Sequence, residues 1–193
     1  MSGLLLLFAN SPFVRADAYT FSAAQTAHPG LSSIFTPTIH YWREEILTWS
    51  AEFDLDPNLA ATVMQIESCG DLRALSSAGA QGLFQVMPFH FYSADDPFDP
   101  ATNARRGLAY LAKALERAGG NPRLALAGYN GGVGLIGRAE WNWPAETKRY
   151  VFYGAPIYED ARAGRTVSAA LAEWYNLFGA SLCRQAAQRL GLP

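Results

Sequence analysis

Apolar residues recur at helical spacing over most of the chain, and proline-containing caps mark where several helices begin. A capping side chain satisfies a free backbone N–H group, and proline at the first helical position gives up a donor that has no partner. The sequence places a capping residue before a proline at Thr36-Pro37, Asp56-Pro57, Asp99-Pro100 and Asn121-Pro122. Helices are therefore predicted over 37–53, 57–69, 100–118, 122–129, about 145–161 and about 166–190, with Gly70, Gly119 and Gly191 as terminators.

Residues 70–98 follow a different pattern, because Gly79, Gly82 and a proline surround a short apolar run. This composition predicts a small hairpin or an irregular loop. The fold class is mainly α, a single domain with a small β-hairpin or loop element and a docked C-terminal helix. The predicted organisation is 1–16 as a truncated signal peptide, 17–35 as a linker, 36–162 as the domain and 163–193 as the C-terminal helix.

The composition excludes several function classes. Half of the residues are hydrophobic and 13% are aromatic, so the chain is long and apolar enough to form a core. The net charge of −2, with no long run of one sign, provides no electrostatic footprint for nucleic acid or an anionic membrane. The three histidines and two cysteines match no metal-ligand spacing, so no metal site is expected.

The N-terminal stretch SGLLLLFANSPFVRADA contains an apolar run and a small-residue cleavage pattern that ends at Ala16. No basic residue precedes the run, which is short, so we interpret it as a signal peptide without its beginning; a frayed terminus is the alternative. No other segment approaches the length of a membrane span. An exported protein favours a disulfide between Cys69 and Cys183 over two buried free thiols.

Glu67 interrupts an apolar stripe. It follows Val63 by four residues and Ala60 by seven, so it lies on the face that its helix buries. Burial raises the pKa of a carboxyl group, and the dipole at the helix C-terminus acts in the same direction. A carboxylic acid that is still protonated near neutral pH can serve as a general acid in glycosidic cleavage. The alternatives are a side chain turned toward solvent or a structural ion pair with Arg73.

Four separated motifs follow one another along roughly residues 40–158. They are Glu67-Ser68 with Ser76 nine residues later, GLFQ at 82–85 with Met87-Pro88, Tyr129-Asn130 in AGYNGG, and Glu146 with Tyr150-Val151 in ETKRYV. In this order they resemble the soluble lytic transglycosylases, the Slt-type family with a lysozyme-like catalytic domain (glycoside hydrolase family 23-like). The resemblance implies a lysozyme-like fold and a peptidoglycan substrate.

The resemblance also implies a role for each residue. Glu67 would protonate the leaving oxygen of the β-1,4 bond between N-acetylmuramic acid and N-acetylglucosamine. It would then take a proton from the muramoyl 6-hydroxyl, which closes a 1,6-anhydro ring without water. A tyrosine hydroxyl would position Glu67. The residues implied in substrate binding are Ser76, Gln85, Met87, Tyr129, Asn130, Glu146 and Tyr150. The family implies no cofactor, and we expect a monomer in the periplasm or cell envelope.

Three alternatives stay open. The first is that individual motif residues have only structural roles. Gln85 could cap a loop, Ser76 could stabilise a turn and the tyrosines could be core aromatics. A goose-type lysozyme would activate water with a second carboxylate, for which the candidates are Asp71, Asp95, Asp96 and Asp99. A non-catalytic peptidoglycan-binding or assembly module is the alternative outside the enzymes.

Overall fold

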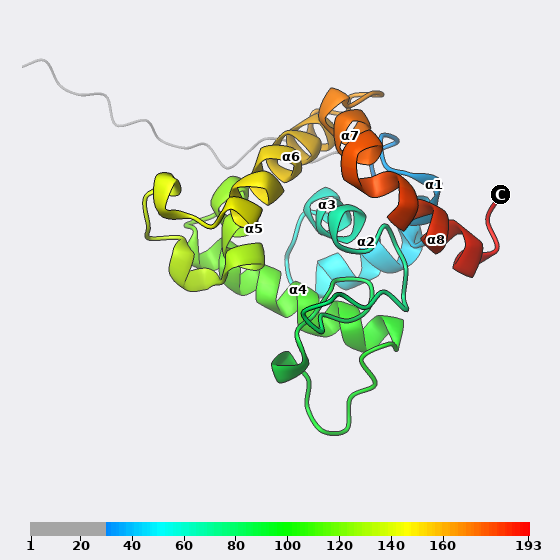
Figure 1. Cartoon of the computed structure of the whole chain (residues 1–193), viewed down its shortest axis with the longest axis horizontal. Helices are drawn as coiled ribbons and strands as arrows, with labels where there is room; N and C mark the ends of the chain where they lie inside the picture. Colours follow the sequence, from blue (N-terminus) through cyan, green and yellow to red (C-terminus); the bar gives the residue numbers. More distant parts are fainter. Residues whose placement is uncertain (1–29) are drawn as a thin grey trace, which may run out of the picture.

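The computed structural model describes residues 30–193, and this part of the chain is almost entirely helical (Figure 1). Its loops contain two isolated β-bridges, and no regular strand occurs between residues 30 and 193. The predicted mainly α fold class is confirmed. The α-helices are α1 (Pro37–Tyr41), α2 (Arg43–Glu52), α3 (Pro57–Glu67), α4 (Pro100–Arg117), α5 (Pro122–Gly131), α6 (Ala145–Arg162), α7 (Ala169–Trp174) and α8 (Ala180–Leu190). The 3-10 turns are η1 (Pro88–His90), η2 (Val133–Leu135) and η3 (Glu140–Asn142), and η4 (Tyr175–Gly179) is a π-helical turn.

Three of the four predicted caps begin their helices as expected. The side chains of Asp56, Asp99 and Asn121 each accept a hydrogen bond from a backbone N–H group two or three residues later. Thr36 makes no such bond, because its hydroxyl donates to Oε1 of Gln65 at 2.9 Å. The Thr36 side chain therefore ties the start of α1 to α3, and α1 begins without a side-chain cap.

The helix predicted over 37–53 is interrupted at Trp42, where φ is −93° and ψ is 15°. The indole N–H of Trp42 donates to the Gly70 carbonyl oxygen at 2.9 Å, which binds this turn to the segment after α3. Gly70 has φ of +82°, and an added Cβ would meet the Thr38 carbonyl oxygen at 2.9 Å. Only glycine fits this close approach. The break depends on residues far apart in the sequence, so helical periodicity could not predict it.

The helix predicted over 166–190 is also divided, into α7 and α8 joined by the π-helical turn η4. Ser168 caps α7, and Gly191 ends α8 with φ of +68°. An added Cβ on Gly179 would collide with the Trp174 ring, so the ring lies directly against the backbone of the turn. The apolar spacing continues through the turn, and the sequence therefore predicted one unbroken helix.

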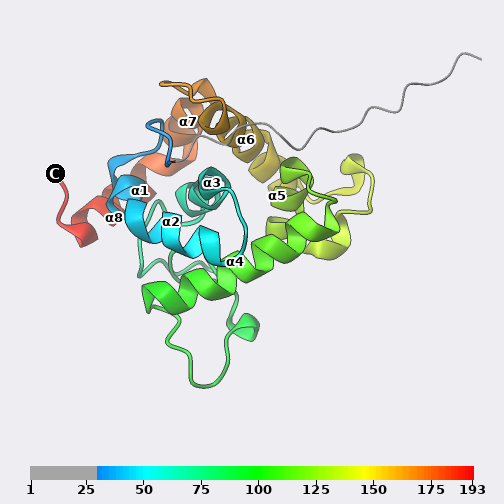
Figure 2. The ribbon, with the colours of Figure 1, turned by 180° about the vertical axis from the view of Figure 1, so that it is seen from behind.

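The hydrophobic core surrounds α3, which lies at the centre of the ribbon in both Figure 1 and Figure 2. Its residues 58–65 are all buried, whereas Ile66 and Glu67 at its end are partly exposed. Burying one large aliphatic side chain contributes about 1.5–3 kcal/mol. The surrounding helices contribute fully buried side chains that include Ile39, Ile46, Leu108, Leu126 and Ile157. Glu67 therefore lies at the partly exposed C-terminal end of the central helix.

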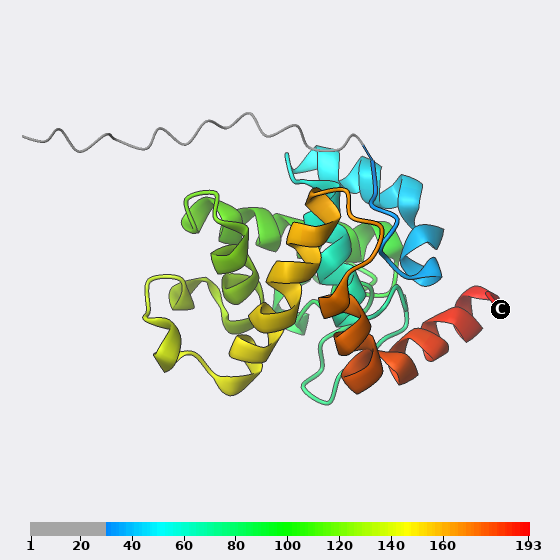
Figure 3. The same ribbon diagram turned by 90° about the horizontal axis from the view of Figure 1, so that it is seen from above.

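Residues 168–190, called here the C-terminal segment, are fastened to the chain just after α3 (Figure 3). Cys69 and Cys183 form a disulfide with a Cα–Cα distance of 5.0 Å. Two residues after Cys69, the fully buried carboxylate of Asp71 accepts hydrogen bonds from Arg189 at 2.6 Å and Gln185 at 2.8 Å. A disulfide that closes so long a loop contributes about 4–5 kcal/mol in the chain-entropy model. The C-terminal segment is thereby held beside Glu67.

The predicted signal peptide and most of the predicted linker lie outside the described residues, and the domain division stays a prediction. Leu31 and Phe35, at the end of the predicted linker, are buried in the same core as the helices. Between residues 30 and 193, no helix is both long and apolar enough to cross a membrane.

Candidate active site

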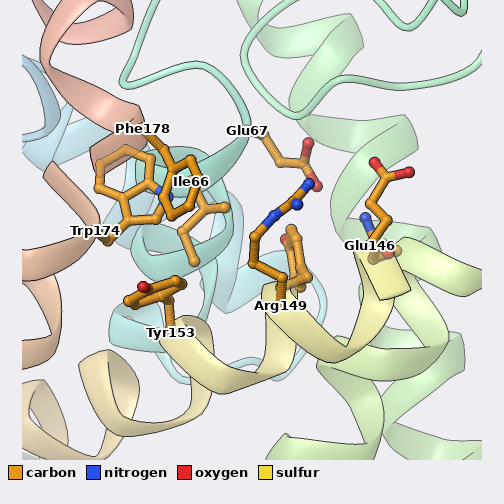
Figure 4. A pocket seen from close by; sticks show the side chains of 9 residues that line it. Ile66, Glu67, Glu146, Arg149, Tyr153, Trp174 and Phe178 are labelled. Carbon is orange, nitrogen blue, oxygen red and sulfur yellow. The ribbon is translucent and has the colours of Figure 1, made fainter. Parts of the chain in front are cut away.

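A cavity of about 200 Å³ opens where α3 ends, and Glu67 lies in its wall (Figure 4). Helices α3, α5 and α6 and the C-terminal segment all contribute to it. Its lining residues are Ile66, Glu67, Asn130, Glu146, Arg149, Tyr150, Tyr153, Trp174 and Phe178. Four of the residues singled out from the sequence, Glu67, Asn130, Glu146 and Tyr150, are thus brought together.

The surroundings of Glu67 favour its protonated form at neutral pH. Burial raises the pKa of Glu67 to about 8, the neighbouring Tyr150 hydroxyl opposes this shift, and the negative charge of Glu146 adds to it. Arg73 makes no ion pair with Glu67, and its guanidinium lies over the Phe98 ring, 5.5 Å from the ring centroid. The ion pair considered from the sequence is therefore wrong, and the Glu67 carboxyl group is mostly protonated at neutral pH.

Two tyrosines, the partly buried Tyr129 and the buried Tyr150, lie near Glu67, and their hydroxyls differ in their hydrogen bonds. The Tyr129 hydroxyl donates to the Phe84 carbonyl oxygen at 2.7 Å, so its proton is already engaged. The Tyr150 hydroxyl is buried and makes no hydrogen bond of regular geometry. Burial and the negative charge of Glu67 both raise the pKa of Tyr150 well above its ordinary value. Tyr150 therefore keeps its proton and is the tyrosine available to interact with the Glu67 carboxyl group.

One face of α6 supplies much of the cavity wall. Glu146, Arg149, Tyr150 and Tyr153 follow one another at intervals of three, one and three residues, which places them on one side of a helix. The Thr147 hydroxyl donates to Oδ1 of Asn130 at 2.7 Å and so joins the start of α6 to the end of α5. Arg149 and Tyr153 were not predicted, although their spacing from Glu146 and Tyr150 was the signal that could have identified them.

A family model, the Transglycosylase SLT domain, matches residues 44–152, which is more than half of the chain. The chain belongs to this family. The resemblance inferred from the four motifs is confirmed, and the matched range contains all of the cavity-lining residues except those from position 153 onward. Tyr153, Trp174 and Phe178 lie beyond the match.

Relatives of this SLT-family chain include a transglycosylase of Enterobacteria phage PRD1, which is 40% identical over 111 residues. The alignment covers 56% of this chain and 40% of the phage protein, so the chain spans well under half of that relative's length. Among solved structures, an inactive variant of the lytic transglycosylase Slt of Pseudomonas aeruginosa gives a TM-score of 0.48 at 22% identity, over 81% of this chain and 25% of that one. The 70 kDa soluble lytic transglycosylase of Escherichia coli gives a TM-score of 0.45 at 21% identity, over 72% of this chain and 25% of that one.

The SLT-motif residues in the loop after α3 do not line the cavity. Ser76 Oγ accepts a hydrogen bond from the backbone N–H four residues later at 2.9 Å. Gln85, with φ of +45°, donates from Nε2 to two carbonyl oxygens of the same loop at 3.0 and 3.2 Å. Met87 immediately precedes the η1 turn. The Ser76 and Gln85 side chains therefore shape the loop, which is the structural alternative that the sequence left open for them.

The aspartates considered as second carboxylates lie away from the cavity and have other partners. Asp71 is paired with Arg189, and Asp95 is paired with Arg106 at 2.7 Å. Asp96 and Asp99 each accept a hydrogen bond from a backbone N–H group in their own turn. In this SLT domain the second carboxylate of the cavity is therefore Glu146. The described residues contain no cluster of three or more acidic, histidine or cysteine side chains that could hold a metal ion.

Sequence reasoning missed the aromatic side of the cavity. Trp174 and Phe178 lie within the predicted C-terminal helix, which was expected only to dock on the domain, yet both line the cavity. Trp174 is buried, whereas Phe178 is 48% exposed. No local pattern distinguishes an aromatic residue that packs in the core from one that borders a cavity.

Proposed function

We propose that this SLT-family protein is a peptidoglycan lytic transglycosylase in which Glu67 is first the general acid and then the general base. The observation that carries the proposal is the Glu67 carboxyl group in the cavity wall, with a pKa of about 8. A group with this pKa can give up a proton and take one back near neutral pH. Membership of the family and the neighbouring Tyr150 support the assignment.

In the proposed reaction, Glu67 donates its proton to the glycosidic oxygen between N-acetylmuramic acid and N-acetylglucosamine. The bond from this oxygen to C1 of the muramoyl sugar breaks, and the substrate's own acetamido group steadies the intermediate. The Glu67 carboxylate then removes the proton of the muramoyl 6-hydroxyl, whose oxygen bonds to C1 and closes the anhydro ring. No water is consumed, and Glu67 ends in its starting protonation state. The Tyr150 hydroxyl donates to the carboxylate while it is charged.

The remaining motif residues take different parts in this proposal. Asn130 and Glu146 line the cavity and would contact the sugar directly. Ser76, Gln85, Met87 and Tyr129 would hold the loop and the start of the cleft at the distance that a glycan strand needs. Peptidoglycan lies outside the cytoplasmic membrane, so the proposed site of action is the periplasm or cell envelope, and we keep the expectation of a monomer.

A hydrolytic muramidase is the second candidate, and the position of Glu146 favours it. Glu146 is exposed in the first turn of α6 and borders the same cavity as Glu67. A carboxylate on the other side of the scissile bond can activate water, as in inverting glycosidases. This enzyme would release reducing ends instead of anhydro ends.

Mass spectrometry of the muropeptides released from purified sacculi distinguishes these candidates. We expect 1,6-anhydromuramoyl products from the unaltered protein and a loss of about 10²–10⁴-fold in Glu67→Gln, the usual contribution of a general acid. Glu45→Gln makes the same chemical change at an exposed position of α2 and should not alter the rate. Reducing ends would identify a muramidase, and sacculus binding without any product would identify a non-catalytic module.

A further inference from the structure

The proposed acid–base reaction leaves one side of the cavity without a role. Figure 4 shows Trp174, Phe178 and Tyr153 together on one side, with Glu67 and Glu146 on the other. Trp174 and Phe178 come from the C-terminal segment, beyond the range that matches the SLT family. This side of the cavity is therefore formed by residues that the family match does not include, with Arg149 of α6 next to them.

Arg149 presents an unpaired positive charge to the cavity. It makes no ion pair with any residue between 30 and 193, although Glu67 and Glu146 line the same cavity. Its guanidinium lies over the Phe178 ring, 5.4 Å from the ring centroid. An arginine held against an aromatic face keeps the N–H groups of its planar edge available, and this edge matches a carboxylate with two parallel hydrogen bonds.

The fold holds this arrangement in place before any ligand binds. The π-helical turn η4 carries Phe178, and the Phe178 ring packs edge-on against Tyr153 with 5.6 Å between the centroids. The disulfide at Cys183 and the ion pair between Arg189 and the buried Asp71 fasten the C-terminal segment beyond the turn. Single π-helical turns occur frequently at functional sites because they redirect side chains locally.

We propose that Arg149 and Phe178 form a subsite for a carboxylate of the peptide stem of peptidoglycan. This inference rests on the proposed function, since it takes the glycan strand as the substrate. Where a stem is attached, the N-acetylated sugars of the strand are neutral, and the anionic groups of the substrate are the stem carboxylates. A guanidinium without a protein partner, next to a half-exposed aromatic ring, fits that part of the substrate. The subsite makes the enzyme prefer stems whose carboxylates are free over stems whose carboxylates are amidated.

The test compares two glycan substrates that differ only in whether the stem carboxylates are free or amidated. For the unaltered protein we expect kcat/KM to favour the free form by about tenfold, the ratio for one hydrogen bond to a charged group. Arg149→Gln should reduce this ratio to about one, and Arg149→Lys should keep part of it because the charge is retained. Phe178→Ala should lower the ratio to an intermediate value, since the guanidinium loses its platform.

Arg184→Gln is the matched control, because Arg184 is an exposed arginine of α8 outside the cavity lining. It should keep the tenfold ratio. An equal preference for both substrates in the unaltered protein, or an unchanged ratio in Arg149→Gln, would overturn the proposal. If neither substrate yields product, the proposed function fails, and calorimetric Kd values for the two muropeptides decide the subsite alone. Tighter binding of the free form that is lost in Arg149→Gln then supports it, and equal Kd values overturn it.

Discussion

The motif residues on the helices and those in the loop after α3 use their side chains in opposite ways. Glu67 and Tyr150, on α3 and α6, face the cavity with polar groups that lack regular partners in the fold. Ser76 and Gln85, in the loop, bond to the backbone of the loop itself. The first pair places reactive groups where the fold does not satisfy them, and the second pair supplies the bonds that keep the loop in shape. The family motifs thus combine residues that we propose for the chemistry with residues whose side chains hold the loop.

The largest expected effect is a gain of stability when Glu67 is replaced. Native Glu67 keeps its proton up to about pH 8, whereas the ordinary pKa of a glutamate side chain, which applies to the unfolded chain, is 4.5. Between these two values the native state binds more protons than the unfolded state, so the free energy of unfolding falls as the pH rises. Glu67→Gln removes this penalty and should raise the free energy of unfolding by about 2–4 kcal/mol at alkaline pH.

Urea unfolding at a series of pH values measures this difference between Glu67→Gln and the unaltered protein. The gain should be complete above about pH 8 and should vanish below about pH 4.5, where both states are protonated. Glu45→Gln provides the baseline, since Glu45 is exposed on α2. A loss of stability in Glu67→Gln across the whole pH range would mean that Glu67 stabilises the fold. The contrast between the cavity residues and the loop residues would then be wrong.

The loop residues should respond in the opposite direction. Gln85→Ala removes the donor shared by two carbonyl oxygens of the loop and should lower the free energy of unfolding by about 1–3 kcal/mol. Gln81→Ala is the matched control, because the Gln81 side chain makes no hydrogen bond within the described chain while its backbone pairs with Val86. Thermal unfolding of both variants measures the difference. Equal melting temperatures for the two would remove the architectural role assigned to Gln85.

The smallest effect is a pair of opposite shifts in the pH profile of cleavage. The reactive form of Glu67 is protonated, so kcat/KM should fall as the pH rises through about 8. Tyr150→Phe removes the interaction that lowers the pKa of Glu67, so the alkaline limb of the pH profile should move to higher pH. Glu146→Gln removes a charge that raises the pKa, so the limb should move to lower pH. Shifts of about 0.5–1 unit are expected for single neighbours of this kind. Shifts in the same direction would contradict the arrangement around Glu67.

Much of the fold was predictable because its signals are local. Asp56, Asp99 and Asn121 begin their helices as predicted, since a cap and the proline after it act within one turn. The break at Trp42 was not predictable, because it depends on a hydrogen bond to Gly70 across the core. The π-helical turn at Tyr175–Gly179 was hidden for a similar reason, since the apolar spacing that encodes a helix continues through it.

The residues of the candidate site likewise divide into those that local sequence signals identify and those that depend on contacts between distant segments. Glu67 was identifiable from one apolar stripe, and the family motifs brought in Asn130, Glu146 and Tyr150. Phe178 was not identified, because nothing in the sequence places the C-terminal segment beside α6. Arg149 was missed although its helical spacing from Glu146 and Tyr150 indicated it. The bonds of loop residues such as Gln85 depend on a backbone conformation that spacing does not encode.

The most direct test of the account is the pKa of Glu67 itself. An NMR titration of the side-chain carboxyl carbons, with Glu67→Gln to assign the signal, measures this pKa without any substrate. The account predicts a midpoint of about 8. A midpoint below about 5, near the ordinary value for glutamate, would mean that Glu67 is ionised at neutral pH and is not the proton donor.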